Sequence, residues 1–188
     1  MSICSNIDLQ KSIDNLVENV KGYSLSNHDL LQIQPNIKIT MSTDLSKLRF
    51  ADQLFNFQGL GILLWQWSEN AGHWLGLIKK GRTIEIYDSY AFPFNKINEK
   101  LNSGNMKISP NFLLNLIKKS GYKPIFNNIR NQEIKTDDST CGRWVLLRLL
   151  FKNYDLKQFN KILKDFKKDT CLNALELATI YTYKQIQK

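Results

Sequence analysis

The chain has 188 residues, of which 43% are hydrophobic and 11% aromatic, and it carries a formal net charge of +9. This length and apolar content predict one globular domain and exclude a disordered polypeptide. No stretch approaches the ~18 consecutive apolar residues of a membrane span, and the N-terminus lacks the basic start and apolar core of a signal peptide, so we expect neither membrane insertion nor secretion by that route.

The cysteines and the charge distribution bear on the compartment, the metal content and the partners of the protein. The three cysteines, Cys4, Cys141 and Cys171, are scattered and indicate free thiols in a reducing compartment. With only two histidines and no cysteine pair at ligand spacing, no metal site is expected. The net charge is −2 over 1–72 but +6 over 143–188. A basic C-terminal half suits nucleic acid or an acidic partner, although a solvated lysine-rich helix face explains it as well.

The N-terminal region, 1–57, is predicted to be mainly helical. Helical spacing of apolar residues, capping residues, Gly22 and Pro35 set the boundaries. The predicted elements are a helix within 1–24, a short helix from Ser26 or Asn27 to Leu31, an extended segment at 36–41 and a short helix or helical turn at 44–55.

The core, 58–151, is predicted to hold the strands. A dense apolar run and two alternating segments around a Lys-Lys-Gly-Arg loop predict a strand followed by a hairpin. The predicted strands are 59–67, 73–78, 83–87 and 122–127, and the predicted helices are 95–101 and 110–119. Two amphipathic helices, 155–166 and 170–183, follow in 152–188. The order predicts a single α+β domain with a small mixed sheet flanked by helices.

The segment 132–151, QEIKTDDSTCGRWVLLRLLF, predicts a helix that is apolar on nearly every face and therefore buried. Asp137, Asp138, Ser139 and Thr140 are the residue types that cap a helix N-terminus. Cys141 stands at that end, where a thiol has a lowered pKa and a more reactive thiolate. A lone buried cysteine is more often an inert core thiol, so the assignment of a nucleophile depends on other residues.

His73 and Asp88 are the residues that support the assignment of Cys141 as a nucleophile. His73 opens the first strand of the predicted hairpin, and Asp88 follows the second. These two positions are neighbours on adjacent strands, so the carboxylate can orient the imidazole and stabilise its protonated form. Taken singly, each residue is more often a surface or turn residue. Gln132 lies shortly before Cys141, and its amide could donate to a developing oxyanion together with the Cys141 N–H.

The motifs GHWLGLI, IEIYDSYAFP, Gln132 and STCGRWVLLRLL resemble the cysteine proteases that include the adenovirus maturation protease and the SUMO-deconjugating proteases. Within that superfamily the pattern looks most like the maturation proteases of virophages and Maverick-type elements. The resemblance covers about residues 58–151. The gap from glutamine to cysteine is longer than the adenoviral one, and Ala91 stands where the family often has glycine.

The resemblance implies a papain-like α+β fold with the nucleophile at the N-terminus of a buried central helix. It implies a cysteine endopeptidase with His73, Asp88 and Cys141 as catalytic residues and Gln132 in the oxyanion hole. Its implied substrates are capsid precursors cut after small residues or glycine, in the virion or in the reducing cytoplasm and viral factory of the host cell. No cofactor is implied beyond a possible DNA or peptide activator.

Two other functions stay open. Removal of ubiquitin or a ubiquitin-like modifier needs the same catalytic residues. A basic packaging protein that binds nucleic acid is the hypothesis of another class. We expect Trp74 and Trp65 to line a substrate cleft, although plain core packing explains them too. Lys157, Lys161, Lys164 and Lys168 fall on one face of the helix 155–166 and are the candidate DNA contacts.

Overall fold

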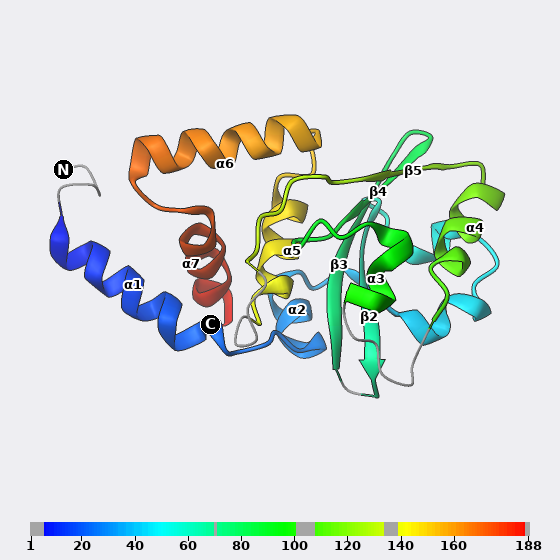
Figure 1. Ribbon diagram of the computed structural model, residues 1–188, viewed down its shortest axis with the longest axis horizontal. Helices are drawn as coiled ribbons and strands as arrows, with labels where there is room; N and C mark the ends of the chain where they lie inside the picture. Colours follow the sequence, from blue (N-terminus) through cyan, green and yellow to red (C-terminus); the bar gives the residue numbers. More distant parts are fainter. Residues whose placement is uncertain (1–5, 70, 101–107, 134–138, 187–188) are drawn as a thin grey trace.

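A five-stranded mixed sheet with helices on both sides makes up the fold (Figure 1). The computed structural model describes residues 6–69, 71–100, 108–133 and 139–186. The strands are β1 (Lys38–Met41), β2 (Leu60–Ser68), β3 (Ala71–Lys80), β4 (Thr83–Tyr87) and β5 (Lys123–Phe126). The helices are α1 (Ile7–Lys21), α2 (Asn27–Ile33), α3 (Ile97–Lys100), α4 (Asn111–Lys119), α5 (Cys141–Leu150), α6 (Leu156–Thr170) and α7 (Ala174–Ile186), with 3₁₀ helices η2 (Ser42–Lys47), η3 (Ala51–Leu54) and η4 (Phe94–Lys96).

The strand order is β1-β2-β3-β4-β5. The central strands β2, β3 and β4 are antiparallel, and the outer strands β1 and β5 pair in parallel with their neighbours. The turn between β3 and β4 needs Gly81, whose φ of 51° is a left-handed conformation that glycine adopts without strain. The predicted hairpin is therefore confirmed, with Lys79 and Lys80 ending β3 instead of lying in the loop.

The two faces of the sheet carry separate apolar clusters. Because side chains alternate along a strand, neighbouring residues of β3 face opposite ways. Trp74 packs with α5 and the other helices of one cluster, whereas Leu75 packs with residues of η3, α3 and α4 in the other. The sheet is thus covered on both faces, which explains why β2 is apolar along most of its length and buried up to Gln66.

Helix α5 is the central helix and packs against β3 on one side and α7 on the other (Figure 1). Its residues from Gly142 to Leu149 are all buried, which confirms the predicted buried helix. Thr140 is the N-cap residue, as predicted, although its side chain makes no capping hydrogen bond. The predicted contributions of Asp137 and Asp138 lie outside the described residues.

Several predicted boundaries differ from the structure. Where a short helix or helical turn was predicted at 44–55, the structure has two 3₁₀ helices, η2 and η3, the first of which begins at Ser42. Helix α6 continues to Thr170, because its amphipathic pattern persists until Cys171 takes a left-handed conformation at the C-cap. The end of the predicted helix 95–101, Leu101, lies outside the described residues.

The cysteines correct one expectation. Cys171 is disulfide-bonded, whereas Cys141 is free, so the expectation of three free thiols is wrong at Cys171. Cys4 lies outside the described residues. Within the described ranges, no helix is long and apolar enough to cross a membrane.

Candidate active site

A hydrogen bond joins His73 of β3 to Asp88, the residue after β4. The His73 Nε2 atom lies 2.7 Å from Asp88 Oδ1, and both side chains are buried. The register explains the contact, since Gly76 pairs with Tyr87 and the two strands separate just beyond this point. The hairpin therefore brings together the two residues that the sequence pattern singled out.

The carboxylate of Asp88 is fixed by the loop that follows it. Its Oδ1 accepts a hydrogen bond from the Tyr90 N–H at 2.9 Å, and its Oδ2 accepts one from the Phe92 N–H at 3.0 Å. Asn127, just after β5, accepts from the Asp88 N–H at 2.8 Å and donates to the Asp88 carbonyl at 2.6 Å. Four hydrogen bonds thus hold Asp88 against the ring of His73.

Cys141, in the first turn of α5, lies near enough to His73 to influence the pKa of the ring. Asp88 occupies Nε2, which leaves Nδ1 as the ring nitrogen available to another partner. Burial is the largest influence on His73 and lowers its pKa. The charge and hydrogen bond of Asp88, with those of Cys141, outweigh burial and raise the pKa of His73 to about 10. His73 is therefore protonated at neutral pH.

Gln132 is held by the two residues that follow Asp88. Ser89 Oγ donates to Gln132 Oε1 at 2.6 Å, and Gln132 Nε2 donates to the Tyr90 hydroxyl at 3.2 Å. The Gln132 N–H also donates to the Ser89 carbonyl at 3.0 Å. The Tyr90 ring in turn stacks on His73, with ring centroids 4.7 Å apart. A chain of direct contacts thus connects the Gln132 amide to the imidazole.

Sequence reasoning missed Ser89, Tyr90 and Asn127. Ser89 and Tyr90 follow Asp88 directly in the YDSY motif, so their nearness in sequence was the available signal. Asn127 gave no such signal, because its contact with Asp88 spans 39 residues and depends on the pairing of β4 with β5.

Trp74 and Trp65 are core residues, and the structure does not support their prediction as walls of a cleft. Trp65 is fully buried, and its indole N–H donates to Asn98 Oδ1 at 2.8 Å. Trp74 is 5% exposed and donates to the Leu25 carbonyl at 2.9 Å. Trp74 instead supports the start of α5, since a Cβ on Gly142 would lie 3.1 Å from its Cδ1 atom.

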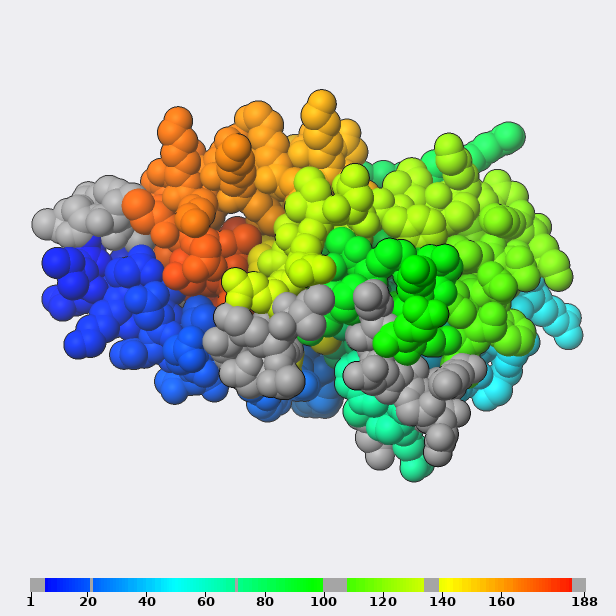
Figure 2. Space-filling view, in the orientation of Figure 1, coloured from blue at the N-terminus to red at the C-terminus, as the bar shows by residue number. Residues whose placement is uncertain are grey.

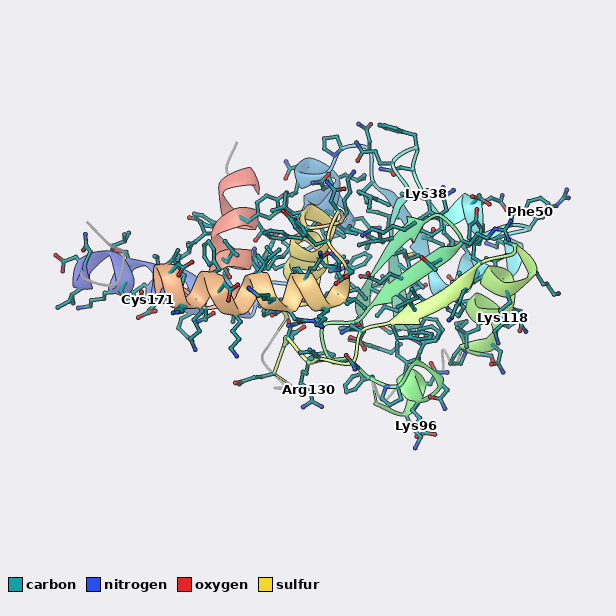
Figure 3. All side chains as sticks on the ribbon, turned by 90° about the horizontal axis from the view of Figure 1, so that it is seen from above. Lys38, Phe50, Lys96, Lys118, Arg130 and Cys171 are labelled. Atoms are coloured by element: carbon teal, nitrogen blue, oxygen red, sulfur yellow. The ribbon has the colours of Figure 1, made fainter. Side chains whose placement is uncertain are left out.

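The four candidate lysines lie on α6, away from the buried residues Phe159 and Leu163. Lys157, Lys161, Lys164 and Lys168 are all exposed. Seen from above, α6 lies across the outside of the helical part of the molecule, with Cys171 at its C-terminal end (Figure 3). The predicted solvent-facing lysine face is therefore confirmed, and its contact with DNA stays a prediction.

The fold and the site together define an α+β protein that brings a cysteine, a histidine and an aspartate close together beside a mixed sheet. No family model matches the chain. It is 32% identical over 165 residues to the uncharacterized protein V9 of Sputnik virophage, with 85% of this chain and 94% of V9 covered. The chain belongs to the family of this virophage protein.

A solved structure resembles the chain more distantly. It is the central domain of the uncharacterized Lpg1148 protein from Legionella pneumophila, with a TM-score of 0.43 and 16% sequence identity. The match covers 88% of this chain and 99% of the Legionella domain.

Proposed function

We propose that the protein is a cysteine endopeptidase that cleaves capsid precursor proteins during virion maturation. The placement of Cys141 near a His73 ring that is hydrogen-bonded to Asp88 is the observation that carries the proposal. Its order is the one that nucleophilic catalysis needs, with a nucleophile on a base and the base held by a third group. The resemblance of the motifs to viral maturation proteases supports the proposal independently.

The first half of the reaction forms an acyl-enzyme. The Cys141 thiolate attacks the carbonyl carbon of the scissile peptide bond, and the carbonyl oxygen becomes an oxyanion. The amide of Gln132 and the N–H of Cys141 hold that oxyanion, because N–H groups in the first turn of a helix have no acceptor within the helix. Protonated His73 donates its Nδ1 proton to the leaving amine, and the C–N bond breaks to leave a thioester.

The second half restores the enzyme. Neutral His73 removes a proton from water, whose oxygen attacks the thioester carbonyl. The C–S bond then breaks and releases the carboxylic acid with the thiolate, while His73 keeps the proton. Asp88 stays ionised throughout and stabilises the imidazolium in both halves.

The family of the chain supports a viral setting for this reaction. V9 is a protein of a virophage, and a maturing particle offers capsid precursors as substrates. The same catalytic residues would serve an isopeptidase that removes ubiquitin or a ubiquitin-like modifier. The substrate therefore has to be identified by comparing the two classes directly.

The decisive experiment incubates the purified protein with its capsid precursor and, in parallel, with a panel of diubiquitins. We expect discrete cleavage of the precursor and none of the panel. Cys141→Ala should abolish cleavage and keep the fold, because a methyl group replaces the thiol with little change in volume.

Cys171→Ala is the matched control. Cys171 is a cysteine of the same chain, and it is not one of the groups that raise the pKa of His73. This variant, and Cys4→Ala, should keep nearly full activity. Loss of activity in either control with an active Cys141→Ala would assign the nucleophile elsewhere. Cleavage of the diubiquitins alone would establish the isopeptidase instead.

A further inference from the structure

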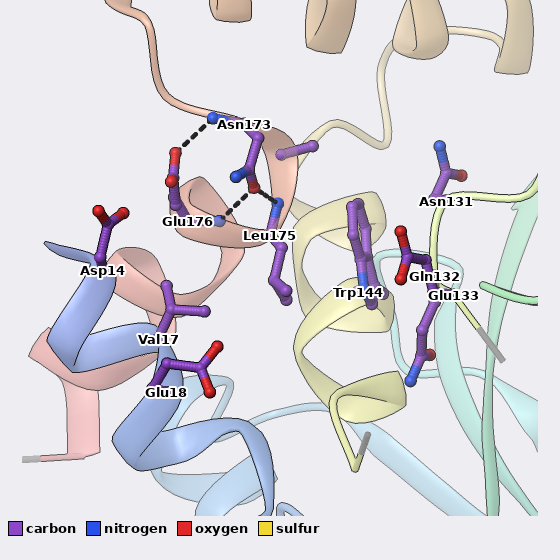
Figure 4. Close-up of a pocket in the computed structure, with 11 residues that line it drawn as sticks. Asp14, Val17, Glu18, Asn131, Gln132, Glu133, Trp144, Asn173, Leu175 and Glu176 are labelled. Carbon is purple, nitrogen blue, oxygen red and sulfur yellow. Dashed lines mark hydrogen bonds between the residues drawn. The ribbon is translucent and has the colours of Figure 1, made fainter. Parts of the chain in front are cut away.

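A cavity of about 540 Å³ lies between α1, the start of α7 and the segment that precedes α5. In Figure 2 these three segments, in blue, red-orange and yellow-green, come together on one face of the molecule. Figure 4 shows the lining residues from α1 and α7 opposite Trp144 and the segment 131–133. The lining consists of Asp14, Val17, Glu18, Asn131, Gln132, Glu133, Trp144, Asn173, Ala174, Leu175 and Glu176.

The charge of this lining is opposite to that of the whole protein. Its ionisable residues are four acids, Asp14, Glu18, Glu133 and Glu176, with no lysine or arginine among the lining residues. Because the whole chain has a net charge of +9, the residues outside this lining together carry a net charge above +9. Asp14 and Glu176 accept hydrogen bonds from the neutral Gln10 amide, and Glu176 also accepts one from the Asn173 N–H. These described contacts order the two carboxylates without neutralising them.

Trp144 provides a second and independent observation. It is 3% exposed, and its indole N–H has no hydrogen-bond acceptor among the described residues. A buried donor without an acceptor is costly, so such a group marks a place where an acceptor is missing. Trp144 lines the cavity and stands three residues after Cys141, on the same face of α5 one turn further on.

The cavity also adjoins the candidate active site. Gln132 lines it, and the same side chain is bonded to Ser89 and Tyr90 beside His73. Val17 and Leu175 add apolar surface to the lining. Lysine and arginine side chains match this combination, because their stems pack on apolar surface while their charged ends reach carboxylates.

We propose that this cavity binds a basic segment of the polypeptide substrate next to the bond that is cut. The identification of the occupant as substrate rests on the proposed endopeptidase function. The cationic side chains of the segment pair with the carboxylates of α1 and α7, and one of its backbone carbonyls accepts from the Trp144 indole. Salt weakens this binding, because the carboxylates on α1 are exposed.

The test measures binding without cleavage, using the full chain carrying Cys141→Ala. The probe is a fluorescent peptide of alternating lysine and glycine, and a peptide of alternating glutamate and glycine serves for comparison. Binding is measured by fluorescence anisotropy at low salt. We expect the lysine peptide to bind and the glutamate peptide not to bind. Asp14→Asn with Glu176→Gln should weaken binding by about tenfold, the combined effect of removing two carboxylates from the lining.

Asp8→Asn is the matched control, since Asp8 is an exposed acid of the same helix as Asp14 and does not line the cavity. This variant should bind as the parent does. Trp144→Phe removes the indole donor and should weaken binding severalfold, with the melting temperature checking that the core is intact. Failure of the lysine peptide to bind, or equal binding by the double variant and the parent, would overturn the proposal.

This result is separate from that of the proposed function. Binding as expected by a protein that cuts no precursor would refute the endopeptidase and leave a site for basic peptides. Cleavage of the precursor with no effect of the double variant on binding or on kcat/KM would refute the cavity alone.

Discussion

The carboxylate of Asp88 is the residue on which the charge state of His73 depends. It lies 2.7 Å from Nε2 and is the largest influence that raises the pKa of the ring. Asp88→Asn keeps the shape of the side chain and removes its charge, so the imidazolium loses its stabilising partner. We expect proteolytic activity to fall by about tenfold or more, measured as kcat/KM on the capsid precursor.

The same variant should show a distinctive pH dependence of stability. His73 has an ordinary pKa of 6.5 and a pKa of about 10 in the folded chain. A group whose pKa is raised on folding stabilises the fold fully below its unfolded pKa and loses that effect as the pH rises through its folded pKa. The stability advantage of the wild type over Asp88→Asn should therefore be largest at or below pH 6.5 and shrink toward pH 10 in denaturant titrations. A constant difference across that range would contradict the assignment.

Substitutions of Gln132 and Ser89 test whether the Gln132 amide stabilises the oxyanion. Gln132→Ala should lower kcat by roughly 10²-fold, the usual loss for one oxyanion donor. Ser89→Ala removes the 2.6 Å hydrogen bond that orients the amide and should lower kcat by a smaller factor, with KM nearly unchanged. An unimpaired kcat in Gln132→Ala would move the role to another residue, with Asn131 and Asn128 as the nearest candidates.

Among the elements, α5 is tied to the sheet by a buried ion pair. The guanidinium of Arg148 is fully buried and binds both carboxylate oxygens of Glu85 on β4, at 2.7 and 2.8 Å. It also donates to the carbonyls of Phe151 and Tyr154 and lies 5.0 Å from the centre of the Phe159 ring on α6. One side chain thus connects the central helix with β4 and α6.

Glu85→Ala leaves that guanidinium buried without its counter-charge. We expect a loss of about 3–5 kcal/mol in the free energy of unfolding, measured by denaturant titration. The exposed pair of Lys161 and Asp165 on α6 provides the control, and Asp165→Ala should change stability little. Equal effects of the two substitutions would show that the buried pair does not hold α5 against the sheet.

The elements also show what the sequence could predict. Ser26 caps α2 with a full capping box, and the alternating pattern of β3 and β4 predicted the hairpin. Both could be predicted because the interactions that form them act over a few residues. The hairpin and the start of α5 were enough to bring His73, Asp88 and Cys141 together. The hydrogen bond from the Trp65 indole to Asn98 and the contact of Asn127 with Asp88 could not be predicted, because they join segments that are far apart in the sequence.

The edge of the sheet gives a further example of such a local signal. The Lys123 N–H points toward β4 and donates to the Arg82 carbonyl. Because backbone N–H groups alternate in direction along a strand, the nitrogen of the next residue, Pro124, points away from the sheet. Proline has no N–H, which leaves this position of the exposed edge without a donor. The edge is thereby a poor template for an added strand, and we expect substrate to bind elsewhere.

In the whole molecule, charges of opposite sign are separated in space. The acidic cavity lies between α1 and α7, whereas α6 presents its lysines to solvent on the outside of the helical part (Figure 3). Lys161 pairs with Asp165 at 2.5 Å, which neutralises part of this face locally. The remaining lysines suit a polyanion, so DNA is the ligand to test.

The last prediction concerns this lysine face, defined by Lys157, Lys161, Lys164 and Lys168. We expect weak, sequence-independent binding of a short labelled DNA duplex that falls steeply between about 50 and 200 mM salt, because phosphate contacts release counterions. Changing the four lysines to glutamine should abolish binding in an anisotropy titration. The matched control changes Lys38, Lys96, Lys118 and Lys119, which are also exposed, and so removes the same charge elsewhere. Equal losses in the two variants would mean that overall charge attracts the DNA, and no binding at low salt would leave α6 a solvated face. Tight DNA binding by a protein that cuts no precursor would favour a packaging role over proteolysis.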